Sequence, residues 1–327
     1  MDAATSSKTD SIANTMQEKL RSIVGAEHLR PANTADGVGS LRPGAVAEPG
    51  NEKELAAVLQ CANELGVSVL PRGGGTKMNW GNPPSRADVI LSTARLNSII
   101  EHVWADLTVT VEAGCTIAKL QESLAQHGQR LALDALWPAQ STIGGVLSAN
   151  ESGALRLRFG GLRDLIIGVT VALPSGALAS SGGKVVKNVA GYDLPKLVTG
   201  AYGTLGVITR AVFRLHPLPR ETRSLSMHAA NVDEAQRLML LLQDCRLAHT
   251  ALQARFGAAA TPNLDIQFEG TGAGLTAQES HLRSLVQPTG VDEAPFTVWD
   301  SRQKLWDASE MSAIAKLSIL QSDVAKT

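Results

Sequence analysis

The sequence predicts an α+β protein in which a large first part, organised around glycine-rich loops, is followed by a smaller α+β domain. Three observations support this prediction. A helix–strand–loop unit spans residues 51–76, apolar strands recur as far as residue 215, and the pattern changes after the two prolines within residues 216–219. Because proline interrupts both helices and strand pairing, we expect a domain boundary there.

The composition is that of an ordinary globular protein, with 44% hydrophobic residues, 19% charged residues and a net charge of −1. The chain has no basic excess that would favour nucleic-acid binding, and its aromatic content of 4% argues against a base-stacking platform. No apolar run approaches the roughly 18 residues of a membrane helix, and the first ten residues lack a secretory apolar core.

The three cysteines lie far apart in the sequence and form no Cys-x-x-Cys pair. This spacing argues against an iron–sulfur cluster, a zinc site or a disulfide framework, and we expect a reducing, cytoplasmic setting. The residues concerned are Cys61, Cys115 and Cys245.

Residues 1–44 are expected to form an N-terminal segment with a single helix. In the next helix, Asn51 and Glu54 predict a capping box, and Gly66 is placed to end it. Helices are expected over residues 11–24, 51–65, 116–127 and 193–199. Strands are expected over residues 67–70, 88–91, 107–112, 164–171 and 207–215, the third of them half-buried because it alternates with period two.

Beyond the proline-containing boundary, the elements follow the order strand, helix, two strands, helix. Asn231 and Glu234 predict a second capping box at the first of these helices. The expected ranges are 224–228, 231–242, 251–256, 264–269 and 278–285, followed by a final apolar strand over residues 314–320. Such an order suits a small α+β layer.

The loop Pro71–Thr76 contains three consecutive glycines directly after a predicted buried strand. Glycine lets the main chain approach a ligand closely and turn its N–H groups toward an anion. The loop fits neither of two familiar phosphate motifs. A Walker loop requires Gly-Lys before Ser or Thr, whereas Lys77 follows Thr76, and a Rossmann loop opens a helix, whereas residues 80–84 read Trp-Gly-Asn-Pro-Pro.

Two further glycine-rich segments, residues 144–145 and 203–206, lie in the same part of the chain beside predicted strands. One glycine turn is ordinary, but three with Ser or Thr beside them suggest a long ligand held largely by main-chain groups. We therefore expect a phosphate-bearing cofactor. Gly74→Val is predicted to abolish its retention, because valine disfavours φ > 0 and blocks close approach.

These motifs carry a resemblance to a known family. Residues 71–76, 138–150 and 203–208 resemble, in order and separation, the FAD-binding domain of the vanillyl-alcohol-oxidase and p-cresol-methylhydroxylase (PCMH) type. Within that superfamily, residues 183–194 (GKVVKNVAGYDL), together with Pro295, Phe296 and Trp299, resemble the FAD-binding E subunit of bacterial glycolate oxidase, also called glycolate dehydrogenase.

The resemblance implies a PCMH-type FAD-binding domain of two α/β subdomains over residues 45–219, after the N-terminal segment 1–44. Residues 220–327 would form a small α+β cap-like domain, and the sequence ends earlier than we expect for this type of subunit.

The resemblance also implies a set of FAD-binding residues. The glycine loop would wrap the pyrophosphate, residues 141–145 would cover the pyrophosphate and ribityl chain, and Val207 and Ile208 would lie beside the adenine or the ring edge. The full predicted set is Pro71, Arg72, Gly73, Gly74, Gly75, Thr76, Pro138, Ser141, Thr142, Ile143, Gly144, Gly145, Ala149, Gly206, Val207 and Ile208.

Three residues in this region have a second interpretation. Arg72 could be an ordinary surface arginine, and Lys187 and Tyr192, which could face the flavin, could be ordinary sheet and helix-cap residues. Thr76 stands where some family members attach the flavin through a histidine. We therefore expect the FAD to be bound non-covalently.

The implied reaction is the oxidation of a 2-hydroxy acid, glycolate to glyoxylate. It requires a base for the hydroxyl proton and a cation for the carboxylate. The region after Pro219 offers only His228, His249 and His281, without a metal-ligand spacing, and no catalytic residue can be nominated from it.

Three functional hypotheses follow. In the first, the chain is the FAD-binding subunit of a glycolate dehydrogenase complex, with a homologous larger flavoprotein, an iron–sulfur subunit and indirect attachment to the inner membrane through these partners. In the second, it is a self-sufficient FAD-dependent oxidoreductase of another small hydroxy acid or alcohol. In the third, it is an assembly subunit that has lost FAD. The sequence leaves open whether this subunit contacts the substrate or only relays electrons.

Overall fold

The computed structural model describes residues 3–183, 192–257, 260–307 and 313–326. The chain divides into two compact units, which are described separately. Unit 1 comprises Met1–Leu131, Trp137–Glu151 and Gly161–Pro217. Unit 2 comprises Ala132–Leu136, Ser152–Gly160 and Leu218–Thr327, so two short internal segments are grouped with the C-terminal part.

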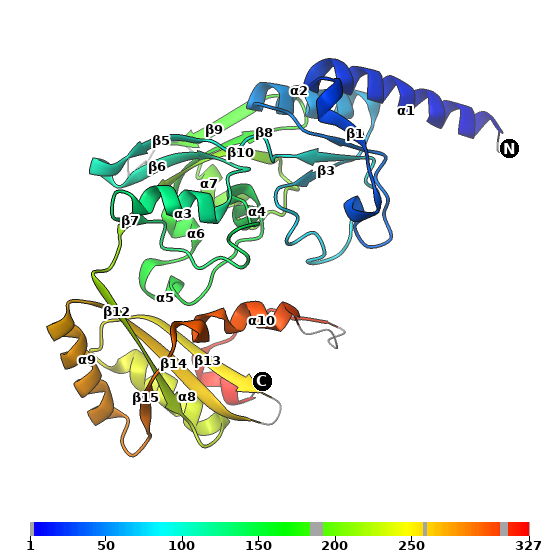
Figure 1. Cartoon of the computed structure of the whole chain (residues 1–327). Helices are drawn as coiled ribbons and strands as arrows, with labels where there is room; N and C mark the ends of the chain where they lie inside the picture. The colour runs from blue at the N-terminus through cyan, green and yellow to red at the C-terminus, as the bar shows by residue number, and fades with distance from the viewer. Residues whose placement is uncertain (1–2, 184–191, 258–259, 308–312, 327) are drawn as a thin grey trace. The chain divides into compact units, whose positions relative to one another are not determined.

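Unit 1 contains a four-stranded sheet of order β1-β2-β4-β3, whose outer strands β1 and β3 are labelled in Figure 1. Strands β2, β4 and β3 run parallel, and β1 is antiparallel to β2. Two helices, α1 and α2, pack with the sheet in one buried apolar cluster that includes Leu20, Leu55 and Val89. The bounds are α1 Ala3–Val24, β1 Leu29–Pro31, β2 Ala45–Ala47, α2 Glu52–Leu65, β3 Val69–Arg72 and β4 Val89–Ser92.

The predicted caps of α2 are present, with one difference. Asn51 Oδ1 accepts hydrogen bonds from the N–H groups of Lys53 and Glu54, and Gly66 ends the helix with φ 65°. The carboxylate of Glu54, however, accepts from the N–H of Gly50 at 2.7 Å and from the side-chain amide of Asn51 at 2.7 Å, rather than from the main-chain N–H of Asn51. The N-terminus of the helix is thus satisfied one residue further upstream than a capping box predicts.

The second sheet of unit 1 is antiparallel and has the order β5-β6-β10-β8-β9 (Figure 1). The predicted half-buried strand lies at its second position as β6, and residues 108–111 are all buried. The prediction of one exposed face was wrong, because alternating Thr and Val suits a strand covered on both faces equally well. The bounds are β5 Ile99–Val103, β6 Thr108–Glu112, β8 Ile166–Ala172, β9 Leu178–Gly182 and β10 Val207–Arg214.

Short helices and a small ribbon complete unit 1. An ion pair of 2.6 Å between Glu52 of α2 and Arg210 of β10 connects the two sheet layers. The remaining elements are α3 Ile117–Ala125, β7 Gln129–Arg130, α4 Ile143–Ser148, α6 Leu162–Leu165, α7 Leu194–Val198 and β11 His216–Pro217, with β7 paired to β11. Thr116 and Asp193 cap α3 and α7 as predicted.

Unit 2 is built on an antiparallel sheet of order β13-β14-β12-β15. Helices α8 and α9 share one buried cluster with the sheet, including Leu238, Ile266 and Leu282. The bounds are α5 Arg156–Phe159, β12 Glu221–His228, α8 Val232–Asp244, β13 His249–Gly257, β14 Ala260–Gly270, α9 Gly272–Leu285, β15 Val291–Glu293 and α10 Ser301–Asp307. Short 3₁₀ turns occupy residues 26–28, 34–36, 104–106, 296–300 and 321–326.

The final strand predicted over residues 314–320 is absent from the part of the chain that the structure describes. Residues 313–320 carry neither helix nor strand, and Leu317 and Leu320 are exposed. An apolar run becomes a strand only where a sheet edge supplies main-chain partners, and residues 313–320 are paired with neither edge strand of this sheet, β13 or β15. The sequence also missed β15, which is only three residues long.

Within the described ranges, no helix is both long enough and apolar enough to cross a bilayer.

Candidate functional site

The first glycine segment leaves strand β3 and turns at Gly75, whose φ is 74°. Among the residues that the structure describes, no acceptor contacts the main-chain N–H groups of Gly73, Gly74, Gly75 or Thr76. Four consecutive N–H donors at the end of a strand form a concave donor surface that suits an anion. This is the feature of the site that most directly indicates a ligand.

Gly73 and Gly74 are required by a close contact between two loops. A Cβ atom at Gly73 would lie 2.0 Å from Thr142 Oγ1, and one at Gly74 would lie 1.8 Å from the carbonyl oxygen of Gln140. Only Gly75 of the triplet has a positive φ. The reason given for Gly74→Val was therefore wrong in one respect, since the obstacle at Gly74 is the neighbouring main chain and not its own φ.

The main-chain N–H groups of the second glycine segment are hydrogen-bonded to other protein groups. Ile143 donates to the carbonyl of Cys115 at 2.9 Å, and Gly144 donates to Ala113 at 2.7 Å. The N–H of Gly145 is capped by Thr142 Oγ1 at 3.3 Å. This segment therefore forms a wall of the site and fixes the Thr142 hydroxyl, while the first segment presents the main-chain donors.

The third segment, residues 203–206, follows a turn that is hydrogen-bonded to helix α4, and it lies beside the first segment. Gly200 and Tyr202 donate main-chain hydrogen bonds to Leu147 and Ser148 of α4 at 2.9 and 3.0 Å. Gly203 has φ 76°, and a Cβ atom there would lie 3.5 Å from the ring of Pro71. The three glycine segments that the sequence picked out separately thus converge in unit 1.

A cavity of about 530 Å³ lies where the segments meet, which is within the size range of small-molecule sites. Most of the residues predicted to bind the cofactor line it. These are Pro71, Arg72, Gly73, Gly74, Gly75, Thr76, Thr142, Gly144, Gly145, Ala149, Gly206, Val207 and Ile208.

The other candidates lie elsewhere. Pro138, Ser141 and Ile143 do not line the cavity, and Ser141 and Ile143 are fully buried behind it. Tyr192 is 90% exposed and is also not part of the lining. Lys187 lies outside the described residues, so its proposed position at the flavin face stays a prediction.

Arg72 is held by a buried carboxylate. Its Nη1 lies 2.7 Å from Asp36 Oδ1, and Arg30 pairs with the other carboxylate oxygen at 2.7 Å. Hydrogen bonds from Arg30 first, then from Asn33 N–H and Arg72, hold the pKa of Asp36 well below its usual range. Arg72 is thus anchored at the cavity rather than free at the surface, which rules out the simple surface-arginine interpretation.

The sequence-based prediction missed Lys77 and Trp80, which also line the cavity. The ammonium group of Lys77 forms a 2.6 Å ion pair with Glu151, and both side chains are nearly buried. A lysine directly after a glycine loop was the available signal. Its partner is remote in the sequence, so the pairing could not be predicted.

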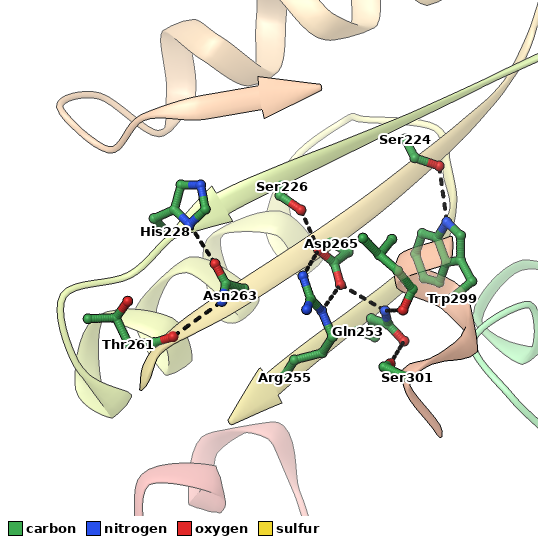
Figure 2. A network of polar contacts seen from close by, with 11 residues as sticks. Ser224, Ser226, His228, Gln253, Arg255, Thr261, Asn263, Asp265, Trp299 and Ser301 are labelled. Atoms are coloured by element: carbon green, nitrogen blue, oxygen red, sulfur yellow. Dashed lines mark hydrogen bonds and ion pairs between the residues drawn. The ribbon is translucent and has the colours of Figure 1, made fainter. Parts of the chain in front are cut away.

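Unit 2 has a polar sheet face on strands β12, β13 and β14 (Figure 2). Asp265 is completely buried there and accepts hydrogen bonds from Arg255 Nε at 2.6 Å and from Gln253 at 2.7 Å, as well as from Ser226. Trp299 donates to Ser224 at 3.0 Å. Because Arg255 is neutralised by Asp265, it offers no ready cation for a substrate carboxylate.

The histidines of unit 2 are dispersed. His228 contacts Asn263 (Figure 2) and lies 3.1 Å from Asp292. His249 is partly buried, and this burial lowers its pKa. Within the described ranges, no three His, Cys, Asp or Glu side chains come together to hold a metal ion, and the three cysteines are free thiols.

The cavity of unit 1 fits FAD in two respects. Two phosphate groups need many donors, and the four N–H groups of residues 73–76 have none of their hydrogen bonds made inside the described protein. The glycines also allow the main chain to lie close to a ligand, since no side chain covers them.

The comparison with protein families agrees with this site. Residues 43–182 match the family described as FAD binding domain. Residues 43–182 therefore form an FAD-binding domain, and the cofactor is FAD.

Several relatives carry the names of enzymes that act on hydroxy acids. The chain is 33% identical to glycolate oxidase subunit GlcD of Bacillus subtilis, over 68% of this chain and 49% of that protein. It is also 33% identical to D-lactate dehydrogenase of Archaeoglobus fulgidus, over 60% and 44% of the two chains. The chain therefore spans about half or less of the length of these relatives.

Solved structures show the fold. The chain superimposes on p-cresol methylhydroxylase with a TM-score of 0.75 at 15% identity, covering 90% of this chain and 69% of that one. It superimposes on alkyldihydroxyacetonephosphate synthase with the same TM-score at 18% identity, covering 89% and 63%. At these identities the likeness concerns the fold and not the reaction.

Proposed function

We propose that the chain is the FAD-containing part of a 2-hydroxy acid oxidoreductase, and that it acts in a glycolate dehydrogenase that oxidises glycolate to glyoxylate. The observation that carries the proposal is the cavity, with four main-chain N–H donors that meet no acceptor among the described residues. The names of the relatives, a glycolate oxidase subunit and a D-lactate dehydrogenase, support the substrate class.

Each part of the site has an assigned role in this proposal. When bound, FAD supplies the acceptor for the two electrons that leave the hydroxy acid. The N–H groups of residues 73–76 bind the diphosphate. Arg72 lies at the same wall and shares the one carboxylate of Asp36 with Arg30, so this group of three side chains keeps a net positive charge there. Val207 and Ile208, which line the cavity, cover an apolar part of the cofactor.

We further propose that the FAD is not covalently attached at the glycine loop. Thr76 stands at the position where a histidine forms that bond in some family members, and its hydroxyl lies 3.1 Å from Ser141 Oγ. Threonine offers no imidazole nitrogen for such a bond. The cofactor is then held by contacts alone, and its affinity depends directly on how the loops are positioned.

The chain is proposed to work with two partner subunits, a larger homologous flavoprotein and an iron–sulfur protein. The resemblance of residues 183–194 to the E subunit of glycolate oxidase supports this, as does the pairing of Arg255 with Asp265, which leaves this arginine without a free charge for substrate. We place the complex in the cytoplasm, at the inner membrane through its partners. Affinity purification of the tagged native protein is expected to recover both partners, and recovery of a lone monomer with full glycolate activity would refute the assignment.

The visible spectrum of the purified chain tests the reaction. We expect flavin absorbance near 450 nm after reconstitution, and bleaching by anaerobic glycolate only when the partner flavoprotein is present. D-lactate and D-2-hydroxyglutarate serve as comparison substrates. Absence of bleaching by every hydroxy acid in the reconstituted complex would contradict the proposed substrate class.

A second candidate function is a self-sufficient oxidoreductase of another small hydroxy acid. The similarity to D-lactate dehydrogenase and to D-2-hydroxyglutarate dehydrogenase of Xanthomonas citri, 33% identical over 54% of this chain and 38% of that protein, favours it. Bleaching of the flavin by D-lactate or D-2-hydroxyglutarate in the isolated chain would support this candidate over the first. A protein that stays colourless after FAD is added would instead indicate an assembly subunit without cofactor.

A further inference from the structure

Lys77 places a buried positive charge at the junction of two glycine segments. Its Nζ lies 2.6 Å from Glu151 Oε2, and the two side chains are only 8% and 2% exposed. Nζ also donates to Ser141 Oγ at 2.9 Å and to Thr76 Oγ1 at 3.1 Å. Three oxygens from two separate segments thus surround one ammonium group.

The ion pair is largely removed from water. The rings of Trp80 and Trp137 both have their centroids 5.7 Å from Lys77 Nζ, so the charge lies between aromatic faces with little water around it. In such a medium a paired charge is held firmly, and a charge that loses its partner is costly. The pair therefore fixes the spacing of the segments that carry it.

The contacts reach both sides of the cavity. Lys77, Thr76 and Trp80 belong to the first glycine segment, whereas Ser141 and Glu151 lie on either side of helix α4, the element that forms the second wall. Thr76 and Lys77 line the cavity, while Ser141 is buried behind it. The ammonium group of Lys77, a residue that lines the cavity, thus connects the two walls.

We infer that Lys77 is a positioning residue, which ties the donor loop of residues 73–76 to the second wall through Glu151 and Ser141 and so preorganises the cavity for FAD. The inference rests on placing FAD in this cavity. It does not depend on which hydroxy acid is oxidised.

A direct contact between Lys77 and a cofactor phosphate is the main alternative. Two of the three N–H donors of this ammonium group are used by Ser141 Oγ and Thr76 Oγ1, and Glu151 Oε2 lies 2.6 Å from Nζ as an ion-pair partner. Its charge is also neutralised by Glu151 at 2.6 Å. Both facts favour a bridge between loops over a phosphate ligand, and the two roles predict opposite effects of removing Glu151.

The test compares FAD affinity with the stability of the FAD-free protein in four variants of the full chain. Lys77→Met and Glu151→Gln each remove one charge, the double variant removes both, and Lys53→Met removes an exposed lysine of α2 as the control. Apoproteins are titrated with FAD by flavin fluorescence and unfolded thermally without FAD.

Each single variant is expected to bind FAD at least tenfold more weakly and to unfold at a lower temperature. The double variant should recover much of the melting temperature, because a neutral pair buries well, but should still bind FAD as weakly as the single variants. Lys53→Met should match the wild type. If Lys77→Met does not fold, the double variant decides the question, since it retains no unpaired charge.

Three results would overturn the inference. Tighter or unchanged FAD binding by Glu151→Gln, with weak binding by Lys77→Met, would make Lys77 a phosphate ligand. Recovery of both stability and FAD affinity in the double variant would reduce the bridge to a purely structural role. Failure of the wild type to bind FAD would refute the cavity assignment and the bridge together, whereas FAD that binds but is not reduced by glycolate would refute only the proposed reaction.

Discussion

Replacing Gly74 with alanine is expected to separate the first glycine segment from the second and to weaken FAD binding. The added Cβ atom would lie 1.8 Å from the carbonyl oxygen and 2.8 Å from the carbonyl carbon of Gln140. Because real Cβ contacts essentially never fall below 3.0 Å, one segment must move by at least about 1.2 Å.

The second segment resists this movement. The N–H groups of Gln140 and Ser141 both donate to the carbonyl of Trp137, at 2.9 and 2.8 Å, and the carbonyl of Ser141 accepts from Ile117 at 2.9 Å. Overpacking at a site that cannot relax costs about 1–3 kcal/mol. If FAD binding must restore the original spacing, this corresponds to about 5- to 150-fold weaker binding. Gly74→Val should be more severe for the same reason.

Equilibrium titration of the apoprotein with FAD measures this effect. Gly161→Ala is the matched control, because a Cβ atom there meets nothing within 4 Å and the residue has a negative φ. The control should bind FAD within about twofold of the wild type, since it changes no contact of the cavity. Wild-type affinity in Gly74→Ala would refute the close approach of the two segments as the basis of the site.

Three further predictions follow from other parts of the chain. Asp36→Asn should lower the free energy of unfolding by about 2 kcal/mol at pH 7 relative to the exposed control Asp106→Asn, by chemical denaturation. Because the pKa of Asp36 is lower in the folded than in the unfolded chain, this stabilisation is present above about pH 4 and is lost as the pH falls further. If the stability of Asp36→Asn depended on pH in this range as strongly as that of the wild type, the pairing would be contradicted. Burial lowers the pKa of His249, so the unfolded chain binds a proton that the folded chain excludes. The free energy of unfolding should therefore fall from pH 7 to pH 5.5, by at most about 1.4 kcal/mol per pH unit. His249→Gln should reduce this slope, and an unchanged slope would mean that another group causes it. Acid precipitation of the FAD-loaded protein should release the flavin into the supernatant, because Thr76 cannot tether it, and a yellow pellet would show a covalent bond.

Local signals in the sequence predicted most helices and strands of the fold. Asn51, Gly66, Thr116 and Asp193 mark helix ends through interactions with their immediate neighbours, so their role can be read without the rest of the chain. The predicted strand over residues 314–320 failed because pairing depends on a sheet edge that the local pattern does not reveal.

The candidate site was predicted in part for a similar reason. Glycine-rich segments can be recognised from composition alone, and three of them in one domain indicated an extended ligand. The structural reason for each glycine could not be predicted in the same way. Gly74 must be glycine because the carbonyl of Gln140 lies against it, and the sequence does not show that these two residues are neighbours. Lys77 and Glu151 were missed because a buried ion pair between distant residues leaves no local pattern.

A crystal structure of the protein with FAD tests the central claim most directly. The account predicts phosphate oxygens of the cofactor within about 2.7–3.2 Å of main-chain nitrogens in residues 73–76, with Lys77 still paired to Glu151. An FAD diphosphate bound elsewhere, or bound in this cavity without contact to those nitrogens, would contradict it.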